Sequence, residues 1–270
     1  MNHRVTASHR VRSRRLSGGT FEDAEPPVVI EASLHLIVNG TGMATTAIMP
    51  GMEHEFVTGH LFSQGFIDTL DDIEHISIHG NTAHVRIRQQ LPPPATDLMF
   101  SSGGRTIPGT TPLPRLTSDL KVQPSTVFIA MNRLFESASV YRETEGVHAA
   151  GIFTAQAEPL CVMEDIGRHN CLDKVIGWAL LNGVDTGICL LAATGRMTSE
   201  MVTKICRAGI PFAASKTAVT DRGVAIAEAC GMTLAGFVRD AGTRIEQDME
   251  TKTVERALMR VYTGVERVSD

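Results

Sequence analysis

The chain has 270 residues, a formal net charge of -5 and 43% hydrophobic residues. A negative net charge excludes nonspecific binding of nucleic acid through a basic surface, and no apolar run reaches the roughly 20 residues that a membrane-spanning helix needs. Five cysteines without close pairing favour a reducing compartment. We therefore expect a cytoplasmic protein without disulfides that binds neither nucleic acid nor membrane.

The first segment is rich in arginine and has no apolar core, which is not the pattern of a secretory signal. Its arginines are Arg4, Arg10, Arg12, Arg14 and Arg15. We interpret residues 1–25 as a disordered basic tail.

Residues 26–125 have the pattern of a small α+β domain. Residues 27–39 are strand-like, residues 53–66 are helix-like, and residues 76–87 alternate around Gly80-Asn81 as a β-hairpin does. Proline and glycine are frequent from residue 92 to residue 124, so we expect this domain to end in a mobile loop.

Residues 126–245 alternate between strands and helices, beginning with a helix over residues 124–139. The expected strands are residues 159–163, 187–193, 212–215 and 233–239, and the expected helices follow the first three of them. This order predicts a mostly parallel sheet covered on both faces, with its polar loops at one edge. In residues 246–270, Val254, Ala257, Leu258 and Val261 lie at helical spacing, which predicts a C-terminal helix.

The loop after the first expected strand is unusually rich in charge. Glu164 to Gly177 contains Arg168, His169 and Lys174 where a helix begins, and such donors at a helix start suit an oxyanion. The alternative is a structural ion-pair cluster that caps the helix, formed by Glu164, Asp165, Arg168 and Asp173.

A second loop, Thr194-Gly195-Arg196, follows the next strand and again offers glycine and arginine. Upstream, His148 lies in a Gly-x-His-Ala-Ala turn. It is either a general base or ligand donor, or a histidine whose bonds are satisfied in the core.

These residues resemble the signature blocks of the FdhD/NarQ family of formate dehydrogenase accessory proteins, over roughly residues 28 to 242. The most specific block is Glu164 to Gly177, because fourteen ordered positions do not recur by chance. The other matching blocks are Glu31 with Val38-Asn39-Gly40, Glu55 to Ile67, Thr144 to Ala150, Thr194-Gly195-Arg196 with Glu200 and Lys204, Arg207 to Pro211, and Thr233 to Arg239.

The resemblance implies a cytidine-deaminase-like three-layer α/β domain beside the smaller N-terminal α+β domain. Family members are sulfurtransferases: a cysteine desulfurase gives them a persulfide sulfur, and they pass it to the bis-molybdopterin guanine dinucleotide (molybdenum) cofactor before that cofactor enters formate dehydrogenase. The resemblance also implies a homodimer, a nucleotide-binding site and GDP as a surrogate ligand. The implied cofactor-binding residues are Phe237, Val238, Arg239, Asp240, Ala241 and Gly242, to which the charged loops add Glu164, Asp165, Arg168, His169, Asn170, Lys174, Thr194, Gly195, Arg196 and His148.

The sulfur relay is where the chain departs from the family. The two relay cysteines map to Ser102 and Arg105, and a serine hydroxyl forms no persulfide and is a poor nucleophile without an activating base. Cys171 is the surrogate thiol to consider, because a helix start and cationic neighbours lower a thiol pKa, although a packing role is the alternative.

Three functional classes follow. The first is an accessory protein that binds the cofactor and supports its sulfuration. The second is a non-catalytic module that only holds a nucleotide or pterin cofactor. The third is a deaminase-like hydrolase, which the sequence disfavours because no Pro-Cys-x-x-Cys accompanies a His-x-Glu, so we expect no metal site.

Overall fold

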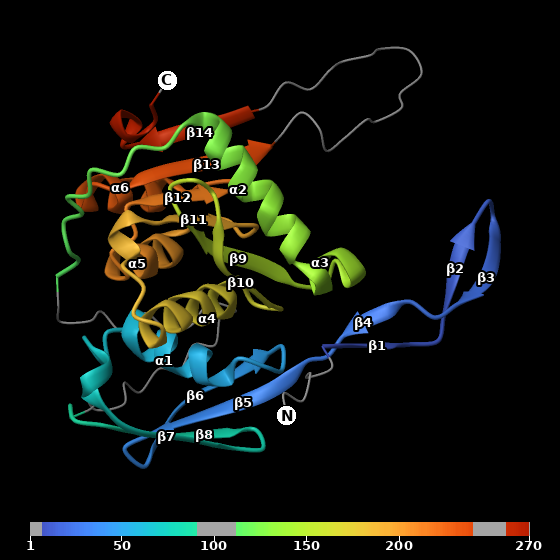
Figure 1. The fold of residues 1–270 in the computed structure, drawn as a ribbon. Helices are drawn as coiled ribbons and strands as arrows, with labels where there is room; N and C mark the ends of the chain where they lie inside the picture. The colour runs from blue at the N-terminus through green and yellow to red at the C-terminus, as the bar shows by residue number, and fades with distance from the viewer. Residues whose placement is uncertain (1–6, 91–111, 240–257, 270) are drawn as a thin grey trace, which may run out of the picture.

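The computed structural model describes residues 7–90, 112–239 and 258–269, which form a small and a large domain with an N-terminal arm (Figure 1). The small domain has a four-stranded sheet in the order β6-β5-β8-β7, in which only β5 and β8 are parallel. The predicted helix and hairpin of this region are both present. The elements are β5 (Ala32–Val38), β6 (Thr41–Ile48), α1 (Glu53–Ser63), a 3-10 turn (Leu70–Asp72), β7 (Ile73–His79) and β8 (Thr82–Ile87).

The large domain is built on a six-stranded mixed sheet in the order β10-β9-β11-β12-β13-β14. Only β11, β12 and β13 run parallel, so the expectation of a mostly parallel sheet is wrong: β9 and β10 form a hairpin, and β14 is an antiparallel edge strand. The elements are α2 (Pro124–Ser137), α3 (Ser139–Thr144), β9 (His148–Phe153), β10 (Pro159–Asp165), α4 (Arg168–Leu181), β11 (Leu190–Ala193), α5 (Ser199–Arg207), β12 (Phe212–Ser215), α6 (Asp221–Cys230), β13 (Thr233–Arg239) and β14 (Leu258–Thr263).

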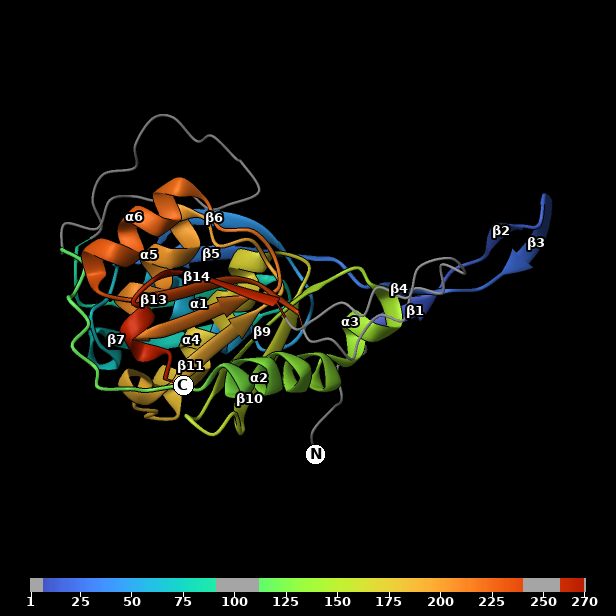
Figure 2. The same ribbon diagram turned by 90° about the horizontal axis from the view of Figure 1, so that it is seen from above.

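Helices cover both faces of this sheet, which makes three layers, as predicted. Helix α2 packs on one face, and α4, α5 and α6 pack on the other (Figures 1 and 2). Residues 112–123 lie along the large domain, since Leu116 N bonds to Cys230 O and Val122 pairs with Val268. Among the described helices, none is long and apolar enough to cross a bilayer.

The N-terminal arm corrects the expectation of a disordered tail for residues 7–25, while residues 1–6 of that tail lie outside the described residues. Strand β1 (Ser8–Arg10) pairs with β4 (Pro27–Val29), and β2 (Ser13–Ser17) forms a hairpin with β3 (Thr20–Ala24) that projects from the body (Figures 1 and 2). Gly18 and Gly19 both have positive φ, 56° and 83°, which is the backbone of a two-residue hairpin turn. Opposite charges face each other across the strands, as in Arg15–Glu22 at 3.1 Å.

The C-terminal segment corrects a second expectation. Residues 258–263 form strand β14 and not a helix, followed by a 3-10 turn at Val265–Arg267. Exposure alternates along β14 with a period of two, which is the period of a strand. The rest of the expected helix, residues 246–257, lies outside the described residues.

The two domains meet where α1 crosses α4. A Cβ on Gly59 would lie 1.9 Å from Asp173 O, and a Cβ on Gly177 would lie 1.8 Å from Glu55 O. The two helix backbones therefore touch, and only glycine fits at either position.

Buried charges reinforce this crossing. Asp173, which is 1% exposed, accepts bonds from Lys204 Nζ at 2.6 and 2.7 Å and from Ser63 Oγ at 2.7 Å, and it lies 3.1 Å from His60 Nδ1. Burial alone would raise the pKa of Asp173, but Lys204 and His60 outweigh it and lower that pKa to about 2. The carboxylate is therefore ionised and joins both domains.

Replacing Gly177 with alanine should destabilise the protein by about 3 kcal/mol, because the new methyl group overpacks a backbone contact. The measurement is the free energy of unfolding in denaturant, with Gly42→Ala as the matched control, since a Cβ on Gly42 meets nothing within 4 Å. If helix propensity decided the outcome, Gly177→Ala would instead stabilise the protein by about 1 kcal/mol.

Candidate functional site

The sheet topology brings several predicted residues to one edge of the large domain. Asp165, at the end of β10, pairs with His148, at the start of β9, and Ala193, at the end of β11, pairs with Ala150. The parallel strands β12 and β13 end at the same edge. We call this the carboxyl edge, because four strands end there, and such edges commonly bind ligands in α/β proteins.

Two arginines and a histidine cluster at the carboxyl edge. Gly195 makes room for Arg168, because a Cβ on Gly195 would lie 2.8 Å from Arg168 Cβ. The buried Thr194 places its Oγ1 3.3 Å from His148 Nδ1 and accepts a bond from Ala149 N at 3.0 Å. The two charged loops predicted to converge are thus packed against each other.

The charges in this cluster repel one another. Burial, and next the charge of Arg196, lower the pKa of Arg168, while Glu200 acts in the opposite direction. Burial, then Arg168 and Arg196, lower the pKa of His148, so that its ring is neutral at pH 7. Within the described part of the chain, no carboxylate lies within 4.0 Å of either guanidinium, and Arg168 Nε is buried without a hydrogen-bond partner.

His169 lies beneath this cluster and is 5% exposed. Burial, followed by the charges of Lys204 and Arg168, lowers its pKa to about 4. Its Nε2 is 3.4 Å from Glu200 Oε2, yet neither ring nitrogen makes a hydrogen bond among the described residues. A neutral ring explains why this close contact is not an ion pair at pH 7.

Three other residues of the charged turn use their polar groups within the fold. Lys174 Nζ pairs with Asp165 at 2.8 Å and donates to Met49 O at 2.9 Å. Asn170 Nδ2 donates to Asp165 Oδ1 at 3.0 Å and to Ala47 O at 2.7 Å. These contacts hold the small domain on the large one, so for Asp165, Asn170 and Lys174 the geometry agrees with the structural alternative.

Glu164 also contacts protein groups. Its carboxylate accepts bonds from Val140 N at 3.2 Å and Tyr141 N at 2.6 Å, at the start of α3. Burial raises the pKa of Glu164, and these backbone donors oppose that effect. Glu164 therefore positions α3 at the carboxyl edge.

The end of β13 is irregular at the predicted cofactor-binding segment. Phe237 has φ 54°, rare for a residue with a side chain, and a register shift separates Gly236 from Arg239. Val238 is buried and Arg239 is exposed, while Arg260 lies over the Phe237 ring at 4.9 Å. Asp240, Ala241 and Gly242 lie outside the described residues.

Of the two roles considered for Cys171, the structure fits packing in the core and not a surrogate thiol with a lowered pKa. Cys171 is 1% exposed and donates to Met163 O at 3.0 Å, and burial raises its pKa well above the usual value. The other four cysteines are also buried, and burial raises the pKa of Cys161 to about 12 and of Cys189 to about 11. Ser102 and Arg105 lie outside the described residues.

Sequence reasoning missed Lys216, which directly follows β12 at the carboxyl edge. The sequence predicts the strand at residues 212–215, but its charged loops with glycine and arginine follow other strands, so they do not point to Lys216. The sequence signal that could have identified Lys216 is its position, one residue past the end of a predicted parallel strand.

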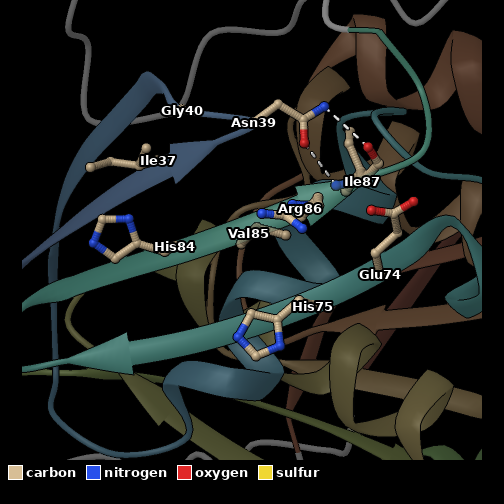
Figure 3. Close-up of a pocket in the computed structure, with 9 residues that line it drawn as sticks. All are labelled: Ile37, Asn39, Gly40, Glu74, His75, His84, Val85, Arg86 and Ile87. Atoms are coloured by element: carbon tan, nitrogen blue, oxygen red, sulfur yellow. Dashed lines mark hydrogen bonds between the residues drawn. The ribbon is translucent and has the colours of Figure 1, made fainter.

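An open hollow of about 540 Å³ lies elsewhere, on the outer face of the small-domain sheet (Figure 3). His75, His84 and Arg86 line it, all three exposed, and Asn39 is held there by bonds to the backbone of Ile87. No predicted site residue lines it. Over the described ranges, no group of three or more His, Cys, Asp or Glu side chains is placed to hold a metal ion.

Acid should destabilise the protein through His169. Because the folded pKa is about 4 and the ordinary value is 6.5, the unfolded chain binds more protons between these values, so stability present above pH 6.5 is lost as pH falls toward 4. At pH 5 the loss from this residue should be about 2 kcal/mol. Unfolding curves at pH 7 and pH 5 should differ less in His169→Gln than in the natural protein, and equal differences would contradict the assignment.

The thiols of the native protein should not react with a thiol reagent such as a disulfide dye, because all five cysteines are buried. The same dye should count five thiols after denaturation. Rapid labelling of one native thiol that disappears in Cys171→Ala would restore the surrogate role.

Comparison with known proteins agrees with the fold and the sequence blocks. The profile of the FdhD/NarQ family matches residues 29–269. A protein named "Sulfur carrier protein FdhD" from Sulfurisphaera tokodaii is 37% identical over 70% of this chain and 76% of its own. A protein of the same name from Nocardia farcinica is 33% identical over 99% of this chain and 96% of its own. A crystal structure of a putative formate dehydrogenase accessory protein from Desulfotalea psychrophila has a TM-score of 0.76 at 24% identity, covering 98% of this chain and 100% of that one, which shows a shared fold. The chain belongs to the FdhD/NarQ family.

Proposed function

We propose that this protein is an accessory protein for formate dehydrogenase maturation, and that its carboxyl edge binds the bis-molybdopterin guanine dinucleotide cofactor. The cofactor is a polyanion, and family members carry sulfur to it. Formate dehydrogenase and a cysteine desulfurase are the proposed partners, and a cytoplasmic homodimer is the proposed form.

The observation that carries this proposal is a contrast between two sets of cations. Lys174 and Lys204 are buried, and each is paired with an aspartate at 2.8 or 2.6 Å. Arg168 and Arg196 repel each other and have no carboxylate within 4.0 Å among the described residues. Cations left without a counter-ion favour an anionic ligand, and guanidinium groups bind phosphate well.

The donors suit phosphate chemistry. Arg168 offers a buried Nε with no partner in the described chain, and Arg196 is exposed beside it. His148 is neutral at pH 7 and can donate or accept one hydrogen bond. These residues would bind and orient phosphate groups, and when bound the cofactor itself supplies the molybdenum chemistry.

The cysteines bear on the sulfur step. A persulfide needs an accessible thiolate, and all five thiols of this chain are buried. This burial favours the second candidate, a non-catalytic module that has lost sulfur transfer and only holds the nucleotide or pterin cofactor. In that form the chain binds and orients, and no covalent bond to sulfur forms on it.

Removing either arginine charge should weaken binding of GDP, the surrogate ligand. Arg168→Gln and Arg196→Gln should each raise the dissociation constant about tenfold, the size expected for one charge-assisted phosphate contact. Isothermal titration calorimetry measures this.

Arg133→Gln is the matched control, because Arg133 pairs with Glu158 at 2.7 Å near the β9–β10 turn, at the opposite edge of the sheet. Its affinity for GDP should equal that of the natural protein. Absence of GDP binding in the natural protein, or equal affinity in all three variants, would overturn the proposed site.

A further inference from the structure

Lys216 belongs to the carboxyl edge through its backbone. Its N donates to Ala193 O at 3.0 Å. Its neighbours bond to the loop that carries Arg196, since Ser215 Oγ donates to Gly195 O at 2.8 Å and Thr217 Oγ1 to Thr194 O at 3.3 Å. The loops after β11 and β12 therefore form one connected surface.

The Lys216 side chain lies on the α2 face of the sheet. Its Nζ is 4.5 Å from the centroid of the Phe135 ring in α2 and 5.8 Å from that of Tyr141 in α3. The two rings are 5.6 Å apart and tilted by 51°. Because Glu164 accepts the Tyr141 N–H at 2.6 Å, α3 and its ring are fixed in place. This aromatic cradle holds the ammonium by cation–π attraction.

The Lys216 ammonium has no carboxylate within 4.0 Å over the described ranges. Two aromatic faces satisfy its charge only in part, because an ammonium carries three N–H donors and the rings accept none of them strongly. If the side chain served only to cover the rings, a methionine would do so without the cost of partly burying a charge. Among the described residues the Lys216 charge therefore has aromatic partners but no carboxylate counter-ion, and Arg168 and Arg196 also lack one.

We propose that Lys216 is a second phosphate-binding position, which selects ligands that carry several linked phosphates. The inference rests on the proposed function of the carboxyl edge. Arg168 begins α4, which covers one face of the sheet, whereas Lys216 lies on the opposite, α2 face. On this proposal a single phosphate contacts one of the two positions, whereas a ligand with several phosphates, such as the guanine dinucleotide cofactor, contacts both.

The test compares three probes on one set of variants: inorganic phosphate, GDP and diguanosine tetraphosphate. Lys216→Met keeps the aliphatic cover over the rings and removes the charge. This substitution should raise the dissociation constant of diguanosine tetraphosphate about tenfold, the loss of one charge-assisted contact. It should change the dissociation constant of inorganic phosphate by less than about twofold. Lys216→Arg should keep most of the affinity, because it keeps the charge.

Lys121→Met is the matched control, since Lys121 is exposed and donates to Glu266 O at 2.7 Å. Equal losses for all three probes in Lys216→Met, or no loss for any, would overturn the selective role. If Arg168→Gln weakens binding while Lys216→Met does not, the site stands and only this inference fails. Absence of binding of every probe to the natural protein overturns the proposed function itself. The melting temperature of each variant confirms that it is folded.

Discussion

The contact between Gly59 and Gly177 is the constraint on which the rest of the arrangement depends. Two helix backbones touch there, with no space for a single methyl group. This contact fixes α4 along its length and therefore fixes the place of its first turn, which carries Arg168 to the carboxyl edge. Asp173 of α4 also accepts a bond from Ser63 in α1 and lies 3.1 Å from His60 in the same helix. Separating α1 from α4 would remove these partners from a buried carboxylate. The ligand-facing residues are thus positioned by the junction between the domains.

The position of each charged residue on α4 decides whether it contacts the small domain or lies at the carboxyl edge. Asn170, Asp173, Lys174 and Gly177 follow the i, i+3, i+4, i+7 spacing of one helix face, and the three polar residues among them bond to the small domain or to residues that hold it. Arg168 lies at the start of the helix, off this stripe, and has no counter-ion among the described residues. One short segment therefore supplies both the joint between the domains and a positive charge that has no counter-ion within the described chain.

Four of the six strands of the large-domain sheet could be predicted from sequence, because an apolar run of four to seven residues ends in a polar loop at each of them. Strand β9 was not predicted, and His148, expected in a turn, is its first residue. The strand at residues 233–239 was placed at its observed bounds. The partners of the charged residues could not be predicted, since the small domain that binds Lys174 lies more than a hundred residues away in the chain. A polar helix stripe looks the same whether it faces a ligand or another helix.

The two segments assigned incorrectly failed for local reasons. Leu258 to Thr263 alternates in exposure with a period of two, but its sequence does not alternate in hydropathy, and Val254, Ala257, Leu258 and Val261 lie at helical spacing. In the arm, Gly18-Gly19 between Leu16 and Phe21 is a hairpin signal that the count of arginines obscured. The glycine pair is the stronger indicator in the arm, because it has a direct steric cause and a count of arginines has none.

The backbone at Phe237 adds an independent reason to place function at the carboxyl edge. A side-chain-bearing residue with φ 54° costs on the order of 1 to 3 kcal/mol, and such residues persist only where their surroundings enforce the conformation. Here Phe237 N donates to Thr217 O at 3.0 Å, and Arg260 lies over its ring. Glycine at this position would relieve the strain but would lose the ring. The strained residue therefore bonds to Thr217, which directly follows Lys216. It lies at the same edge where Arg168 and Arg196 lack counter-ions within the described chain. Neither backbone strain nor unpaired charge stabilises the fold, so finding both at one edge favours a functional role for it.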